Sequence, residues 1–133
     1  MNIINILVIV FVCLMHNINA LDCGDVDGSG NLYIANSVTS IAANAFKGCT
    51  DLKTISYQSG STLESIEDHA FHSTGLTTIT IPASVTSIGN YAFYSCSSLT
   101  SVSFESGSQL TSIGSSAFQQ SGLTTNHYTC ICN

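Results

Sequence analysis

Five side chains that can ligate a metal ion or exchange protons are grouped in one short segment: Glu64, Glu67, Asp68, His69 and His72. Carboxylates and imidazoles do such chemistry in a pocket that excludes water and shifts their pKa values. This segment surrounds an expected turn at Phe71, and nothing in the sequence pattern encloses it. We therefore interpret the group as a solvated charged turn.

No other pattern predicts catalysis. The serines are numerous, but none stands in a Gly-x-Ser-x-Gly nucleophile turn. The repeats described below also leave no unique constellation of reactive groups. We accordingly predict no enzymatic activity, no catalytic residue and no cofactor.

A second candidate segment resembles the start of a calcium-binding EF-hand loop. Asp25, Asp27 and Ser29 take the first, third and fifth ligand positions, and a glycine takes the sixth. The twelfth position is Asn36, where calcium needs a bidentate glutamate. No flanking helix is expected, because residues 32–34 have the pattern of a strand. We favour a glycine-rich turn before an N-terminal capping strand, and calcium binding is the alternative.

The net charge of the chain restricts the kinds of partner that it can bind. The chain has two basic residues, Lys47 and Lys53, against eight acidic residues, and its net charge is −6. Two cations cannot neutralise a phosphate backbone, which argues against nucleic acid as a partner. The same balance argues against binding to an anionic membrane surface.

The N-terminus has the pattern of a targeting segment. Residues 3–15 are almost continuously apolar and are followed by polar residues up to Ala20. A membrane span takes about 20 apolar residues, so this run is too short and is typical of a signal peptide. We predict a signal peptide over residues 1–20 and a secreted or cell-surface mature chain. An uncleaved membrane anchor is the alternative, because no basic residue starts the segment and Ile18 is bulky for its position.

The rest of the chain is built from repeats. The phenylalanines of four Ala-Phe dipeptides, Phe46, Phe71, Phe93 and Phe118, are separated by 25, 22 and 25 residues. A V/L-x-S-I block precedes each one, and an L-x-x-I-x-I block follows it. One copy has too little apolar surface to fold alone, whereas stacked copies share an interior. The sequence therefore predicts a short repeat solenoid with a capping segment over 21–36, four repeats over 37–128 and a tail over 129–133.

The L-x-x-I-x-I block predicts the strand of each repeat. Alternation turns the leucine and the aliphatic positions inward and the residues between them outward. Strands of a parallel sheet lie about 4.8 Å apart, so the outward side chains align in rows. This hydroxyl-rich face is our candidate partner-binding surface: Thr54, Ser56, Thr77, Thr78, Thr80, Thr100, Ser101, Ser103, Thr125 and His127.

The blocks VTSIGxxAFxxC, SLTSVxF and GLTTITIPASV resemble the BspA-like leucine-rich repeats over about residues 37–123. The resemblance implies a right-handed array with a parallel sheet on its concave face and turns or short helical segments on its convex side. It also implies a secreted or surface-exposed protein, since several such proteins take part in adhesion to host or matrix proteins. The match weakens at Asn126, which takes an inward aliphatic position. The fourth strand is therefore a weak strand or a polar cap, or the chain is a truncated copy.

Five cysteines lie beyond the predicted signal peptide: Cys23, Cys49, Cys96, Cys130 and Cys132. Cys49 and Cys96 are two coils apart, about 9.6 Å at sheet spacing, which exceeds the roughly 7 Å that a disulfide spans. We predict that these two do not pair, and their position in the family repeat implies small buried core residues. Pairing of Cys23 with Cys49, and of Cys96 with Cys130 or Cys132, remains open. A half zinc site at His127, Cys130 and Cys132 is a further alternative.

These observations predict a binding or adhesion module that meets an extracellular protein or a glycan surface. Because the hydroxyl face is weakly charged, hydrogen bonds and shape should dominate its contacts. The rival hypothesis is a structural role, in which the apolar ends of a short solenoid self-associate. A hydroxyl array that orders water or ice is a third hypothesis.

Overall fold

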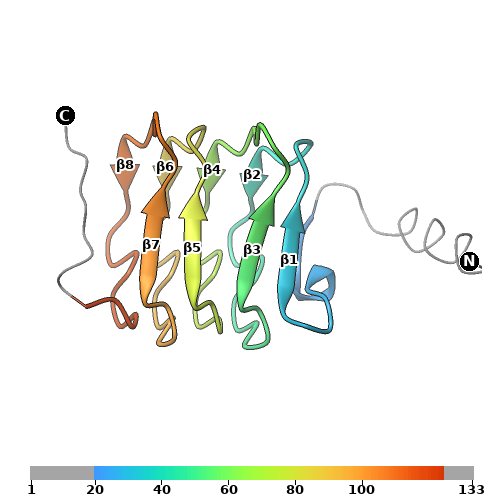
Figure 1. Cartoon of the computed structure of the whole chain (residues 1–133). Coiled ribbons are helices and arrows are strands. Elements are labelled where there is room, and N and C mark those ends of the chain that lie inside the picture. The colour runs from blue at the N-terminus through green and yellow to red at the C-terminus, as the bar shows by residue number, and fades with distance from the viewer. Residues whose placement is uncertain (1–19, 125–133) are drawn as a thin grey trace, which may run out of the picture.

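The computed structural model describes residues 20–124, which wind into a parallel β-solenoid of about four coils (Figure 1). Each full coil contributes one long and one short strand. The long strands are β1 (Asn31–Ile34), β3 (Thr54–Tyr57), β5 (Thr78–Ile81) and β7 (Ser101–Phe104). The short strands are β2 (Ser40–Ile41), β4 (Ser65–Ile66), β6 (Ser87–Ile88) and β8 (Ser112–Ile113). The predicted repeat solenoid is confirmed.

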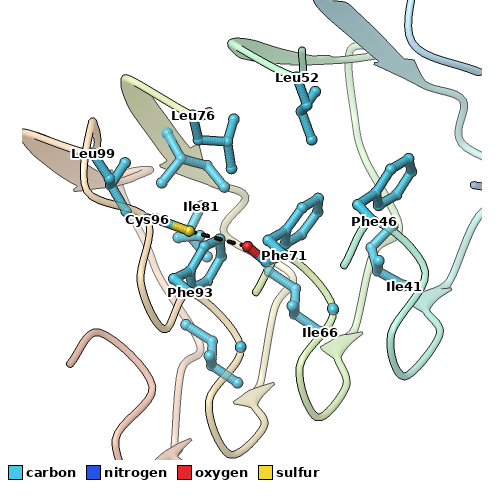
Figure 2. Close-up of a cluster of buried hydrophobic side chains, with 14 of the residues drawn as sticks. Ile41, Phe46, Leu52, Ile66, Phe71, Leu76, Ile81, Phe93, Cys96 and Leu99 are labelled. Atoms are coloured by element: carbon cyan, nitrogen blue, oxygen red, sulfur yellow. Dashed lines mark hydrogen bonds between the residues drawn. The ribbon is translucent and has the colours of Figure 1, made fainter. Parts of the chain in front are cut away.

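The interior is a column of apolar side chains that recur at fixed positions of the repeat (Figure 2). The leucine that opens each strand block is fully buried, as Leu52, Leu76 and Leu99 show. Full burial of such a side chain stabilises the fold by about 1.5–3 kcal/mol. The L-x-x-I-x-I blocks therefore form strands because each coil must bury the same face against its neighbours.

The four repeat phenylalanines form one continuous stack. Neighbouring ring centroids lie 5.2, 5.3 and 5.1 Å apart from Phe46 to Phe118, and the ring planes are within 10° of parallel. The backbone N–H of Phe71 donates to the carbonyl of Ala92, at 2.8 Å, and the bonds of Phe46 and Phe93 are equivalent. The stack thus joins all coils through both side chains and backbone.

The turns that carry this stack contain two left-handed residues per coil, four positions apart. In the second coil these are His69 and Ser73, with φ of 59° and 58°, and the other coils repeat the pattern. The side of the solenoid where we expected turns or short helices is therefore made of turns. The one helix among residues 20–124 is a single 3-10 turn, η1 (Cys23–Asp25), before the first coil.

The short strands form a second sheet that the sequence did not predict. β2, β4, β6 and β8 pair in this order in one parallel ladder, with serine opposite serine and isoleucine opposite isoleucine. In Figure 1 they run behind the long strands and in the opposite direction. Each V/L-x-S-I block is thus a strand as well.

The long strands form two pairs instead of one continuous ladder. β1 pairs with β3, and β5 pairs with β7, both in parallel. β3 and β5 lie side by side (Figure 1), and a backbone hydrogen bond of 3.1 Å from Thr77 to Lys53 links them. The rows of outward side chains therefore continue from β3 to β5, although these two strands do not pair as a regular hydrogen-bonded ladder.

The capping segment over residues 21–36 contains η1 and the whole of β1. The carboxylate of Asp22 caps η1 by accepting the N–H of Gly24. Leu21 and Val26 pack against the first coil and cover part of its interior. The segment therefore closes the N-terminal end of the core and adds a strand to it.

The outer parts of the chain lie outside the described residues. These are most of the predicted signal peptide, the end of the fourth repeat and the 129–133 tail, with Thr125, His127, Cys130 and Cys132. Within residues 20–124, no helix has the length and apolar character that a membrane crossing requires.

Candidate binding surface

The long-strand sheet presents the predicted hydroxyl residues on its outer side. Thr54 and Ser56 of β3, Thr78 and Thr80 of β5, and Ser103 of β7 are exposed, while Ser101 is half-buried. Thr77 and Thr100 precede β5 and β7 and are also exposed. The six residues within the strands thus alternate with inward side chains, as the sequence pattern predicts.

The hydroxyl groups on this surface bond mainly to one another or to the backbone of the preceding coil. The Thr80 and Ser103 hydroxyls lie 2.9 Å apart, and Ser56 donates to the carbonyl of Leu32. Thr77 donates to the carbonyl of Lys53, and Thr100 to that of Thr77, both at 3.3 Å. Several of these donors are already engaged, so the surface offers oxygen lone pairs and methyl groups together with the hydroxyls of Thr78 and Ser101.

The surface extends one strand further than the predicted list. β1 adds Asn31, whose side-chain oxygen accepts the Thr54 hydroxyl, and Tyr33, whose side chain is 59% exposed. The sequence does indicate this strand, since polar and apolar side chains alternate over residues 31–34 as they do in the later strands. We refer to the exposed outer side of β1, β3, β5 and β7 as the long-sheet face.

A second hydroxyl row follows the short strands. The Ser65 hydroxyl lies 3.0 Å from that of Ser40 and 2.7 Å from a carboxylate oxygen of Glu67. Sequence reasoning missed this row because it assigned no strand to the V/L-x-S-I blocks. The signal available was the recurrence of Ser-Ile in all four coils.

The acidic and histidine residues of the second coil do not converge on one point. Glu67 contacts the serine row, and Asp68 accepts the backbone N–H of Asn90 in the next coil, at 2.7 Å. No three potential metal-ligating side chains come together among the described residues. The interpretation as a charged turn was incomplete, however, because both histidines contact aromatic rings.

His69 and His72 belong to an array of four rings on the outside of the turns. His69 stacks on Tyr91 and His72 on Tyr94, with ring centroids 5.1 Å apart in both pairs. The two histidines lie 5.5 Å apart, and the two tyrosines meet edge to face at 5.6 Å. Burial, Lys47 and His69 lower the pKa of His72, which favours the neutral form of its ring. We call these four residues the ring cluster.

The EF-hand-like segment uses its carboxylates in two separate turns. Asp27 accepts the backbone N–H groups of Ser29 and Asn31, at 2.8 and 2.9 Å, and these bonds lower its pKa. Asp25 instead accepts the backbone N–H of Asp22. Asp27 therefore organises a turn that leads into β1, as the favoured interpretation of this segment requires.

An open cavity of about 290 Å³ lies beside β2 at the N-terminal end of the short-strand sheet. Leu21, Val38 and Ala42 line it together with three hydroxyl side chains. Its described lining contains apolar and hydroxyl side chains and no ionisable group.

The structure contains one of the cysteine pairings that the sequence left open, and the cysteines considered as partners of Cys96 lie outside the described residues. Cys23 forms a disulfide with Cys49, with Cα atoms 5.7 Å apart, and ties the capping segment to the first coil. Among residues 20–124, Cys96 has no disulfide partner, and its fully buried thiol donates to the carbonyl of Phe71, as Figure 2 shows. Burial raises the pKa of this thiol. Cys49 and Cys96 are thus both core residues and do not pair with each other, as predicted.

A family model described as the BspA type leucine rich repeat region matches residues 28–132, in six copies. The Ala-Phe spacing, by comparison, divides the chain into four. The search of curated proteins found no match.

Two solved structures resemble the chain and agree with this fold. The crystal structure of the pneumococcal vaccine antigen PcpA is 29% identical and covers 69% of the chain, with a TM-score of 0.62. A leucine rich cell surface protein from Faecalibacterium prausnitzii A2-165 is 38% identical and covers 56% of it, with a TM-score of 0.52. The chain spans 28% of the first protein and 19% of the second.

Proposed function

The chain belongs to the BspA-type leucine-rich-repeat family, and on this premise we propose that it is a secreted or cell-surface module of the adhesion type. Its long-sheet face binds an extracellular protein or a glycan surface. Its role is binding, without catalysis. The family and the cell-surface protein among its structural neighbours support this location.

The observation that carries the proposal is the regular, rigid and weakly charged long-sheet face. Most of its hydroxyl side chains bond to a neighbouring coil, so little conformational freedom is lost when a partner docks. Two charged residues of opposite sign adjoin it, Lys53 just before β3 and Glu105 just after β7. A partner would therefore meet mainly hydroxyl groups, methyl groups and the exposed ring of Tyr33.

The test is a binding assay of the purified full chain against a panel of extracellular matrix proteins and surface glycans. The variant T80R/S103R places two bulky charges at the centre of the face. It should weaken binding by at least about tenfold, as the loss of central interface contacts does.

A matched control carries the same charges elsewhere. Thr111 and Ser112 are exposed and lie at the last short strand, so the variant T111R/S112R should bind like the wild type. Equal binding by T80R/S103R and the wild type would show that the long-sheet face is not the binding surface.

A second candidate function is self-association, which one observation favours. Ile113 of β8 is 49% exposed, whereas its counterparts Ile41, Ile66 and Ile88 are buried. Among the described residues, the last coil thus leaves an apolar side chain open at the end of the core. Sedimentation velocity of the full chain should then show association that I113K abolishes, and a wild-type monomer at every concentration would exclude this function.

A further inference from the structure

The ring cluster is a surface feature that the fold itself does not require. The interior phenylalanine stack runs through all four coils, but the ring cluster occupies only the second and third. At the same repeat positions the first coil has Asn44 and Lys47, and the last coil has Ser116 and Gln119. Coils of this solenoid therefore form without aromatic rings at these positions.

The backbone at the cluster is also in a conformation that disfavours aromatic residues. Tyr91 and His69 are left-handed, with φ of 55° and 59°. A left-handed residue with a Cβ costs about 1–2 kcal/mol, and asparagine and glycine tolerate it best. Asn44 occupies this position in the first coil. Bulky residues held in such a conformation concentrate at functional sites.

The outer edge of the cluster combines aromatic and hydrogen-bonding groups. The stacks end at Tyr91 and Tyr94, because the next coil has Ser116 and Gln119 where rings would continue. Tyr91 is 38% exposed, and Gln119 is exposed as well. Two ring surfaces set at 67° to each other thus lie beside a hydroxyl and an amide side chain.

This surface is preorganised by the turns. The backbone N–H groups of Tyr91 and Ser95 each donate to a carbonyl of the last coil at 3.0 Å, and Asn90 accepts the N–H of Ser115 at 2.8 Å. His69 and His72 support the two tyrosines from behind. Binding would order few groups, which keeps its entropic cost low.

We propose that Tyr91 and Tyr94, with Ser116 and Gln119 of the next coil, form a binding site for a neutral glycan chain. A sugar ring has an apolar face of C–H groups, which pack on the electron-rich face of a phenol ring. Its equatorial hydroxyls need donors and acceptors in the same plane, which amide and hydroxyl side chains supply. The four named residues contain both kinds of group and no charge.

The pair of rings favours an extended chain over a single sugar. The ring centroids of Tyr91 and Tyr94 lie 5.6 Å apart, so neighbouring units of one chain can contact both rings. A peptide partner fits the site less well, because the four residues carry neither an aliphatic side chain nor a charge for a peptide to pair with.

The test is saturation-transfer NMR of the full chain with two probes, cellohexaose and chitohexaose. The wild type should transfer saturation to the sugar C–H protons of at least one probe. The variant Y91N/Y94Q should lose the transfer, or bind at least about tenfold more weakly. These substitutions install side chains that stand at the same positions in other coils, Asn44 and Gln119, so the fold should persist.

The control is Q109A, which removes an exposed amide side chain that lies outside both proposed surfaces and should leave the transfer unchanged. No transfer to either probe from the folded wild type would overturn the proposal, as would equal transfer by Y91N/Y94Q. The long-sheet variant T80R/S103R separates this site from the proposed adhesion face. This variant should still transfer saturation to the sugar probe, even if it no longer binds the extracellular partner of the long-sheet face.

Discussion

At the scale of single residues, the hydroxyl of Tyr57 is one of two buried side-chain polar atoms that lack a hydrogen-bond partner among residues 20–124. Tyr57 takes the inward position that Ile34, Ile81 and Phe104 fill in the other long strands. Its hydroxyl is buried and has no hydrogen-bond partner, and burial, with a smaller contribution from Glu105, raises its pKa. The polar tip therefore reduces the stability that the ring provides.

The variant Y57F should accordingly be more stable than the wild type. A buried polar group without a partner costs about 1–3 kcal/mol, and phenylalanine keeps the ring while removing that group. Urea unfolding should show a higher midpoint for Y57F. Y33F removes a solvated hydroxyl and serves as the control, with no change expected. A lower midpoint for Y57F would mean that the hydroxyl is satisfied in solution.

The residue scale also shows where sequence reasoning failed. His69 and His72 were grouped with their acidic neighbours along the chain, whereas their contacts are with residues of the next coil. The pairs His69–Tyr91 and His72–Tyr94 each span 22 residues, the local repeat length. Aligning the outward positions of the turns, as was done for the strands, would have revealed them.

At the scale of elements, the long strands were predictable and the short strands were not. The L-x-x-I-x-I block is long enough to show strand alternation, so β3, β5 and β7 follow from the sequence. A two-residue strand such as β2 has no period to detect. It exists because stacking of whole coils brings identical Ser-Ile pairs together, which is a property of the assembled solenoid.

At the left-handed turn positions, replacing a residue with glycine should stabilise the chain instead of destabilising it. Ser116 has a φ of 56°, whereas Ser115 is not left-handed. S116G should stabilise the chain by about 0.4–1 kcal/mol or more, because glycine takes this conformation without strain. S115G should destabilise it, because there glycine only adds freedom to the unfolded chain. Thermal unfolding of the two variants checks this, and an equal effect at both positions would contradict the described turns.

At the scale of the whole molecule, stability depends on contacts between coils. Each coil lacks a core of its own, so the phenylalanine stack and the disulfide to the capping segment join units that cannot fold alone. The two solved structures that resemble the chain share this architecture. The partner does not follow from the fold, because the residues that contact it are the outward ones, which the apolar pattern does not determine.

The centre of the stack should matter more than its end. Phe71 is fully buried between two rings, whereas Phe118 is only partly buried at the last described coil. F71A should cost about 3–5 kcal/mol, which approaches the entire stability of a small domain. F118A should cost less. Urea unfolding of both variants measures the difference, and equal losses would argue against a stack with an interior and an end.

The disulfide should protect the N-terminal end of the solenoid. Cys23 and Cys49 close a loop with a sequence separation of 26 residues, and a loop of this size contributes roughly 3 kcal/mol. Reduction should therefore lower the unfolding temperature of the wild type. A C23A/C49A variant should unfold at the lower temperature with or without reductant. An unchanged wild-type transition after complete reduction would contradict this role.

Native-state hydrogen exchange tests the continuous solenoid most directly. The amide protons of Phe46, Phe71 and Phe93 bond to the next coil in the same way, so all three should exchange slowly and at similar rates, with those of the short-strand ladder. Fast exchange at any of the three, or three unrelated rates under conditions that leave the fold intact, would contradict a shared stack. The long-sheet face and the ring cluster would then have no common scaffold.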